Sequence, residues 1–97
     1  MSDNIPPSGF TRFYRSKSKR FDFKFGFVPE GDHLAIYCLH HPPHGRDPDP
    51  HKTHLFSNGK ICFVVGREPR TRERALQLAA QWAEYILEYA RTGISQR

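Results

Sequence analysis

The residues that decide the fold are Arg20-Phe21-Asp22-Phe23-Lys24-Phe25-Gly26-Phe27, in which phenylalanine occupies every second position. Successive side chains of a strand point to opposite faces, so this period of two predicts a half-buried antiparallel strand. A polar turn at 16–19 separates it from an earlier candidate strand at 10–16. The stretch Pro29-Glu30-Gly31-Asp32 predicts the turn that follows, because proline and glycine supply the dihedral angles that tight turns need.

A third strand is expected at His33–Leu39, where apolar residues occupy both faces. A strand of this kind is either central in its sheet or covered by a helix on one side and by a loop on the other. The three strands together predict an antiparallel meander.

One long helix is expected over Arg72–Thr92, with Thr71 as its N-cap and Gly93 just past its end. Apolar residues recur along it at helical spacing, which predicts one buried face. They are Ala75, Leu78 or Ala79, Trp82, Ile86 and Tyr89, with a second row of Leu76, Ala83, Leu87 and Ala90. The predicted fold class is therefore α+β: an antiparallel meander, a long proline-rich loop and one C-terminal helix packed on the sheet.

The 97 residues are enough for one domain at 10–97, preceded by a flexible arm at 1–9. No signal peptide or membrane-length apolar run stands out, so a cytoplasmic protein with two reduced thiols is expected. The net charge of +5 favours an acidic partner. Because no nucleic-acid motif accompanies the basic residues, a solvated face or a protein-docking face is preferred to nucleic-acid binding.

The strand pattern stops between His40 and His54, where four prolines and a glycine exclude regular structure. The chain then reaches His54-Leu55-Phe56-Ser57-Asn58-Gly59-Lys60-Ile61-Cys62-Phe63. The Asn58-Gly59 pair predicts a tight type I′ turn, in which both central residues have positive φ. A cysteine just past such a turn is either a presented nucleophile or a small buried apolar residue. Cys38, in the middle of a strand, is expected in the core.

This order of parts resembles the ubiquitin-conjugating enzyme family, and most of all its reduced bacterial members. His54-Leu55-Phe56 stands where that family has His-Pro-Asn, and Cys62 follows His54 at the family's spacing of eight residues. His41-Pro42-Pro43 resembles the proline segment, and Gln81–Tyr89 resembles the Trp- and Tyr-rich closing helix. The resemblance covers residues 20–93. The family's N-terminal helix is absent, and Phe56 replaces its asparagine.

The resemblance implies that Cys62 takes the activated carboxyl terminus of a ubiquitin-like or other operon-encoded protein as a thioester, then passes it to an amine. It implies a transferase whose partners are that carboxyl donor, an activating enzyme and a target protein. No cofactor is expected, because the activating enzyme would consume the ATP. His54 would order the loop or act as a base, and Asn58 could donate to the oxyanion. Similar bacterial proteins belong to antiphage-defence or ubiquitin-like conjugation operons.

Two other interpretations stay open. A non-catalytic variant of the same fold would serve as a protein-interaction module. A small basic domain would instead bind nucleic acid or zinc, for which the pairs His41-x-x-His44 and His51-x-x-His54 are candidate ligands. Structural zinc sites usually contain closely spaced cysteine pairs, which this chain lacks, so a solvated histidine-rich loop is preferred and no metal is expected.

Overall fold

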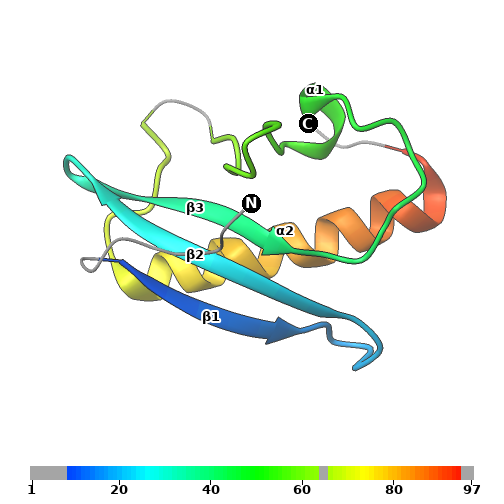
Figure 1. Cartoon of the computed structure of the whole chain (residues 1–97), viewed down its shortest axis with the longest axis horizontal. Helices are drawn as coiled ribbons and strands as arrows, with labels where there is room; N and C mark the ends of the chain where they lie inside the picture. Colours follow the sequence, from blue (N-terminus) through cyan, green and yellow to red (C-terminus); the bar gives the residue numbers. More distant parts are fainter. Residues whose placement is uncertain (1–8, 64–65, 95–97) are drawn as a thin grey trace.

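The computed structural model describes residues 9–63 and 66–94, which contain three strands and two helices (Figure 1). They are β1 (Phe10–Arg15), β2 (Asp22–Glu30), β3 (His33–His40), α1 (Pro50–Thr53) and α2 (Arg72–Thr92). The predicted α+β class is confirmed, as are the bounds of the long helix and its caps Thr71 and Gly93. The predicted arm at 1–9 lies outside the described residues, apart from Gly9.

The sheet is antiparallel in the order β1-β2-β3, so β2 is its central strand. Two expectations about β2 are wrong at its ends. The strand continues through Pro29 to Glu30, and the turn falls at Gly31, whose φ is 62°. Phe21 lies before the strand and is 37% exposed, because the preceding turn closes with the N–H of Ser16 donating to the carbonyl of Phe21 at 2.9 Å.

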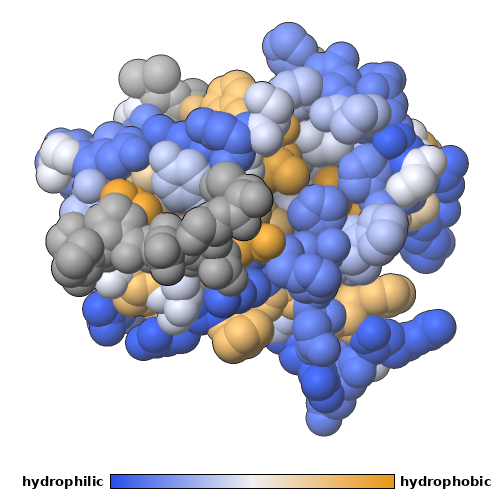
Figure 2. Space-filling model, viewed as in Figure 1, coloured by the Kyte–Doolittle hydropathy of each residue, from blue (hydrophilic) through white to orange (hydrophobic). Residues whose placement is uncertain are grey.

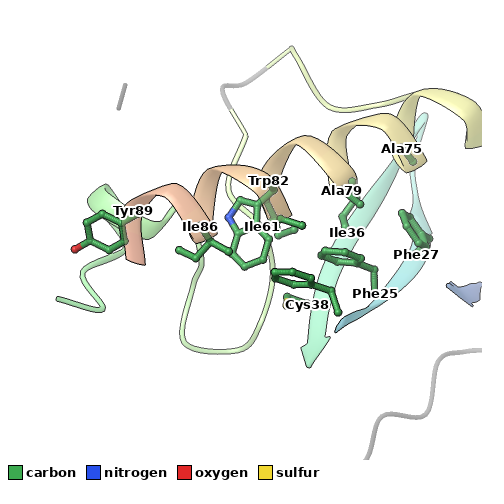
Figure 3. Packing of buried hydrophobic residues seen from close by; sticks show 12 residues of the cluster. Phe25, Phe27, Ile36, Cys38, Ile61, Ala75, Ala79, Trp82, Ile86 and Tyr89 are labelled. Atoms are coloured by element: carbon green, nitrogen blue, oxygen red, sulfur yellow. The ribbon is translucent and has the colours of Figure 1, made fainter. Parts of the chain in front are cut away.

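Helix α2 covers one face of the sheet, and the phenylalanines of β2 pack against it (Figure 3). Trp82 meets Phe23 and Phe25 edge-on, with ring centroids 6.3 and 6.0 Å apart. Each fully buried phenylalanine stabilises the fold by about 1.5–3 kcal/mol. The other apolar residues buried in this core are Phe27, Ala35, Ile36, Cys38, Ile61, Ala75, Ala79, Ala83, Ile86 and Tyr89.

Cys38 belongs to this core, as expected. It is 8% exposed, and its thiol donates to the carbonyl of His40 at 3.4 Å. Burial raises the pKa of the Cys38 thiol to about 12. Since the thiolate is the reactive form of cysteine, burial keeps Cys38 in its less reactive thiol form at neutral pH.

The proline loop (residues 41–54) is tied to α2 by aromatic side chains of the helix. Trp82 Nε1 donates to the carbonyl of Thr53 at 2.9 Å, and the Tyr89 hydroxyl donates to the carbonyl of Asp47 at 2.9 Å. The Tyr85 hydroxyl donates to the carbonyl of Lys52. The carbonyl groups of a loop that pairs with no strand need hydrogen-bond donors from elsewhere in the protein. The indole N–H and the two tyrosine hydroxyls of α2 supply these donors, and they thereby fix the path of the proline loop.

The same loop contains α1, which the proline content led us to exclude. Asp49 is the N-cap, its carboxylate accepting from the N–H of His51 at 2.9 Å, and Pro50 occupies the first turn. Proline is tolerated there because the first N–H groups of a helix have no intrahelical partner. The expectation failed because it treated proline as a helix breaker at every position.

The surface seen in Figure 2 is mostly hydrophilic, and its apolar residues show as small separate patches. Within residues 9–63 and 66–94, no helix is both long and apolar enough to cross a bilayer.

Candidate functional site

Residues 54–62 form a hairpin, called the cysteine hairpin below. Leu55 and Ile61 face each other across this hairpin. On one side of the pair the N–H of Phe56 donates to the carbonyl of Lys60 at 2.9 Å, and on the other side the N–H of Cys62 donates to the carbonyl of His54 at 2.8 Å. The N–H of Gly59 donates to the carbonyl of Phe56 at 2.9 Å.

The turn of this hairpin differs from the predicted type I′ turn. Gly59 has a φ of 91°, but the non-glycine residues with positive φ in the described chain are Lys19 and His54, not Asn58. This is the three-residue hairpin in which a type I turn is followed by a left-handed glycine. Glycine is required at position 59 for a second reason, since a Cβ there would lie 3.2 Å from the carbonyl oxygen of Cys38.

The second arm of the cysteine hairpin pairs with the outer edge of β3. The N–H of Cys38 donates to the carbonyl of Gly59 at 2.7 Å, and the N–H of Ile61 donates to the carbonyl of Ile36 at 2.8 Å. Ile61 is 2% exposed and belongs to the core on the α2 side. Because side chains alternate along an extended chain, Cys62 is directed to the other face of the sheet.

Cys62 is a free, half-buried cysteine at the wall of a hollow of about 160 Å³, called the thiol hollow below. Its other lining residues are His33, Leu34, Ala35, Phe56, Lys60, Ile61, Phe63 and Glu68. Small-molecule sites usually measure roughly 300–1,000 Å³. The thiol hollow therefore has room for a single side chain or a short piece of backbone, and not for a nucleotide-sized ligand.

Charged groups surround the thiol hollow. Lys60 Nζ donates to Glu30 Oε1 at 2.9 Å, which raises the pKa of the Lys60 ammonium. His33 Nε2 lies 3.8 Å from the same Glu30 oxygen, and His33 Nδ1 lies 3.5 Å from Asp32 Oδ1. Glu68 Oε1 accepts from the N–H of Gly66 at 2.9 Å. One thiol, one imidazole, one ammonium and three carboxylates thus lie in or beside one small hollow.

Sequence reasoning did not place His33, Glu30 or Glu68 at this site. His33 and Glu68 line the thiol hollow, and Glu30 lies beside them, because the cysteine hairpin pairs with β3 and because the carbonyl of Pro69 accepts from the N–H of Leu34 at 2.8 Å. The apolar pattern of 33–39 predicted that both faces of this strand are covered, but it carried no signal for the partner of the strand's edge.

His54 supports the site through its backbone. It ends α1 with a φ of 58°, its N–H donates to the carbonyl of Pro50 at 2.8 Å, and its own carbonyl accepts from Cys62. Its ring lies 5.3 Å from that of Tyr85 on α2, and it is not among the residues that line the thiol hollow. The structure therefore brings His54 and Cys62 together across the hairpin, while the imidazole contacts the helix.

Asn58 lies exposed at the tip of the cysteine hairpin. Its Oδ1 accepts from the N–H of Lys60 at 3.0 Å, which leaves its NH₂ group as the available donor. It is not one of the residues lining the thiol hollow.

His41 and His44 pack the proline loop against α2. The rings of His41 and His44 stack 6.2 Å apart, and they contact Trp82 and Tyr89 respectively. Over the described ranges, no three His, Cys, Asp or Glu side chains are grouped so that they could hold a metal ion.

A larger hollow of about 480 Å³ lies away from Cys62, between the β1–β2 turn, Pro42-Pro43 and the second half of α2. Its charged lining residues include Arg20, Glu84 and Arg91. Glu84 is engaged within the protein, because Oε2 accepts from the Tyr14 hydroxyl at 2.5 Å and from the N–H of Lys17 at 2.9 Å. No cysteine lines this hollow, so the thiol hollow is the better candidate for covalent chemistry.

Comparisons of the chain with protein-family models, with curated proteins and with solved structures find no match. The strands and the helix α2 establish the α+β architecture. The likeness to ubiquitin-conjugating enzymes rests on the sequence motifs around His54 and Cys62, and the geometry of the Cys62 site is the basis for the function.

Proposed function

We propose that Cys62 is the nucleophile of an acyl-transfer protein of the ubiquitin-conjugating type. Its thiolate would attack the carbonyl carbon of an activated protein carboxyl terminus, forming a C–S bond as the activating group leaves. An amine nitrogen of the target would then attack the thioester, forming a C–N bond as the C–S bond breaks and the thiolate returns. The partners would be the carboxyl donor, its activating enzyme and the target.

The observation that carries this proposal is the contrast between the two cysteines. Both thiols are free, but Cys38 is buried in the core with a raised pKa, whereas Cys62 is half-buried and lines a hollow that also contains ionisable groups. The cysteine hairpin is held by its own bonds and by two bonds to β3, so its backbone is fixed before any substrate arrives. A nucleophile that is already in position avoids part of the entropy cost of reaction.

In this proposal His54 is a positioning residue, because its carbonyl accepts from Cys62 and its ring contacts α2. The free NH₂ group of Asn58 is the side-chain amide that could stabilise an oxyanion, which would require the tip of the hairpin to close over the bound acyl group.

A non-catalytic interaction module is the second candidate, and one surface favours it. Strand β1 is an edge strand of the sheet, and Phe13 on it is 78% exposed. Basic groups lie at this edge of the sheet. The guanidinium carbons of Arg12 and Arg72 lie 5.2 and 4.1 Å from the centroid of the Phe10 ring. An edge strand with basic side chains suits an acidic extended partner.

The test uses a fluorescent peptide that ends in Gly-Gly as an alkyl thioester. The protein is incubated with this probe and separated on a non-reducing gel. We expect a fluorescent band that thiol reductants remove, that is absent in Cys62→Ala and that persists in Cys38→Ala. A band of equal intensity in Cys62→Ala, or no band with the wild-type protein, would overturn the catalytic proposal and favour the interaction module.

A further inference from the structure

The thiol hollow is lined by ionisable groups that thioester formation does not use. We propose that it is the acceptor site, which takes a lysine-type primary amine, and that His33 receives the proton this amine must lose. This inference rests on the proposed function, since it concerns the second half of the same reaction.

The size and the walls of the hollow suit a lysine side chain. Its volume of about 160 Å³ accommodates four methylene groups and an ammonium but little more. Ala35, Phe56 and Phe63 provide apolar surface for the aliphatic stem. Carboxylates stand at the polar side, with Glu68 in the lining and Glu30 bonded to Lys60. Long cationic side chains bind in this way, with an apolar stem against apolar walls and the charge beside an acid.

The attacking amine must be neutral, because a protonated nitrogen has no lone pair. A lysine ammonium in water has a pKa of about 10.4, so a nearby base must take its proton. His33 lines the same hollow as Cys62, and carboxylate oxygens lie near its ring, with Glu30 Oε1 3.8 Å from Nε2 and Asp32 Oδ1 3.5 Å from Nδ1. These two acids lie where they can share the positive charge of the ring after it accepts the proton.

The step is then balanced. The ammonium gives a proton to His33, and the neutral nitrogen attacks the thioester carbon to form a tetrahedral intermediate. The C–S bond of this intermediate then breaks, and the nitrogen loses a second proton, which protonates the departing Cys62 thiolate directly or through solvent. The products are an amide and the free thiol, while His33 passes its proton to water.

His33 is a better candidate for this role than His54, the histidine that the sequence motif singles out. His54 has its ring against Tyr85 at 5.3 Å and does not line the hollow. The two histidines therefore have separate roles, in which His54 holds the cysteine hairpin and His33 accepts the proton of the acceptor amine.

The experiment separates acylation from discharge without a natural donor. Cys62 is acetylated with p-nitrophenyl acetate, which releases p-nitrophenolate, and the excess reagent is removed. Loss of the acetyl group is followed by intact mass after adding either Nα-acetyl-lysine or hydroxylamine. Hydroxylamine is already neutral at neutral pH, so its attack needs no base. The variants are His33→Gln and His33→Ala, with Cys62→Ala for acetylation elsewhere and His51→Gln as the matched control, since His51 is 92% exposed.

We expect His33→Gln to be acetylated normally and to discharge to Nα-acetyl-lysine about 10²-fold more slowly, with discharge to hydroxylamine within about a factor of two of wild type. Added imidazole should restore lysine discharge in His33→Ala, and His51→Gln should behave as wild type. Unchanged lysine discharge in His33→Gln, or an equal loss with both amines, would overturn this inference alone. Failure of wild-type Cys62 to be acetylated above the Cys62→Ala background would overturn the proposed function as well.

Discussion

Trp82→Phe tests the conclusion that aromatic side chains of α2 fix the path of the proline loop. The substitution removes the indole N–H that donates to the carbonyl of Thr53 at 2.9 Å, and Thr53 is only 2% exposed. Leaving a buried carbonyl without a donor costs about 1–3 kcal/mol. Phenylalanine is also smaller than tryptophan by about 40 Å³, which adds about 1 kcal/mol at 24 cal/mol per Å³ of cavity. We expect the free energy of unfolding to fall by about 3 kcal/mol.

The assay is urea unfolding followed by far-ultraviolet circular dichroism, because Trp82 is the one tryptophan of the chain and its fluorescence is lost in the variant. With an m-value of about 1.5 kcal/mol/M, the midpoint should fall by about 2 M. Brief proteolysis of the native protein should cut the variant faster within residues 41–54, since a loop that has lost a tether opens locally more often.

Tyr85→Phe is the matched control. It also removes one aromatic donor to the loop, but its bond to the carbonyl of Lys52 is exposed, so water can replace the hydroxyl. Its cost should stay below about 1 kcal/mol. If Trp82→Phe lowers the unfolding free energy by less than about 1 kcal/mol, or if Tyr85→Phe costs as much, the loop is not held by the buried bond and the reasoning is refuted.

Three further predictions concern the turn, the histidine stack and the helix end. Gly59→Ala should lower the unfolding free energy by about 2 kcal/mol, because residue 59 has a φ of 91° and its added Cβ would meet β3. Gly31→Ala is the control, since Gly31 has a φ of 62° but open space around it, and it should cost about 1 kcal/mol. Equal urea midpoints for the two variants would contradict the close approach of Gly59 to β3. Burial and the neighbouring His41 lower the pKa of His44 below its usual 6.5, so the unfolded chain takes up the proton first and stability should fall as pH drops below 6.5. His44→Gln should reduce that loss in midpoints measured from about pH 7.5 to about pH 5.5, and an unchanged pH dependence would exclude the effect. Arg46→Ala should cost about 1 kcal/mol in thermal or urea unfolding, because its guanidinium donates at 3.1 Å to the carbonyl of Ala90 at the end of α2; a cost near zero would mean that water replaces it fully.

The elements of the fold were predictable because their signals are local. The alternation of phenylalanine from Phe23 to Phe27 and the helical spacing of Ala75, Trp82 and Ile86 each lie within one segment. The caps of α2 were predictable for the same reason. Phe21 was misplaced because a second segment decides the outcome there, since the β1–β2 turn excludes it from the strand. Helix α1 was missed for a local reason, since proline is tolerated in a first helical turn.

The site was predictable only in part. The sequence by itself determined a cysteine placed shortly after a hairpin turn, eight residues after His54. Tertiary structure alone decided what surrounds that cysteine, because the hydrogen bonds of Gly59 and Ile61 to β3 bring His33 into the same hollow, with Glu30 beside His33. It also decided the path of the proline loop, whose carbonyls find their donors on α2. The periodicity of a segment shows which of its own faces is buried. The contacts of the cysteine hairpin with β3 and of the proline loop with α2 join segments far apart in the chain, and no local pattern specifies which edge or which donor a segment will meet.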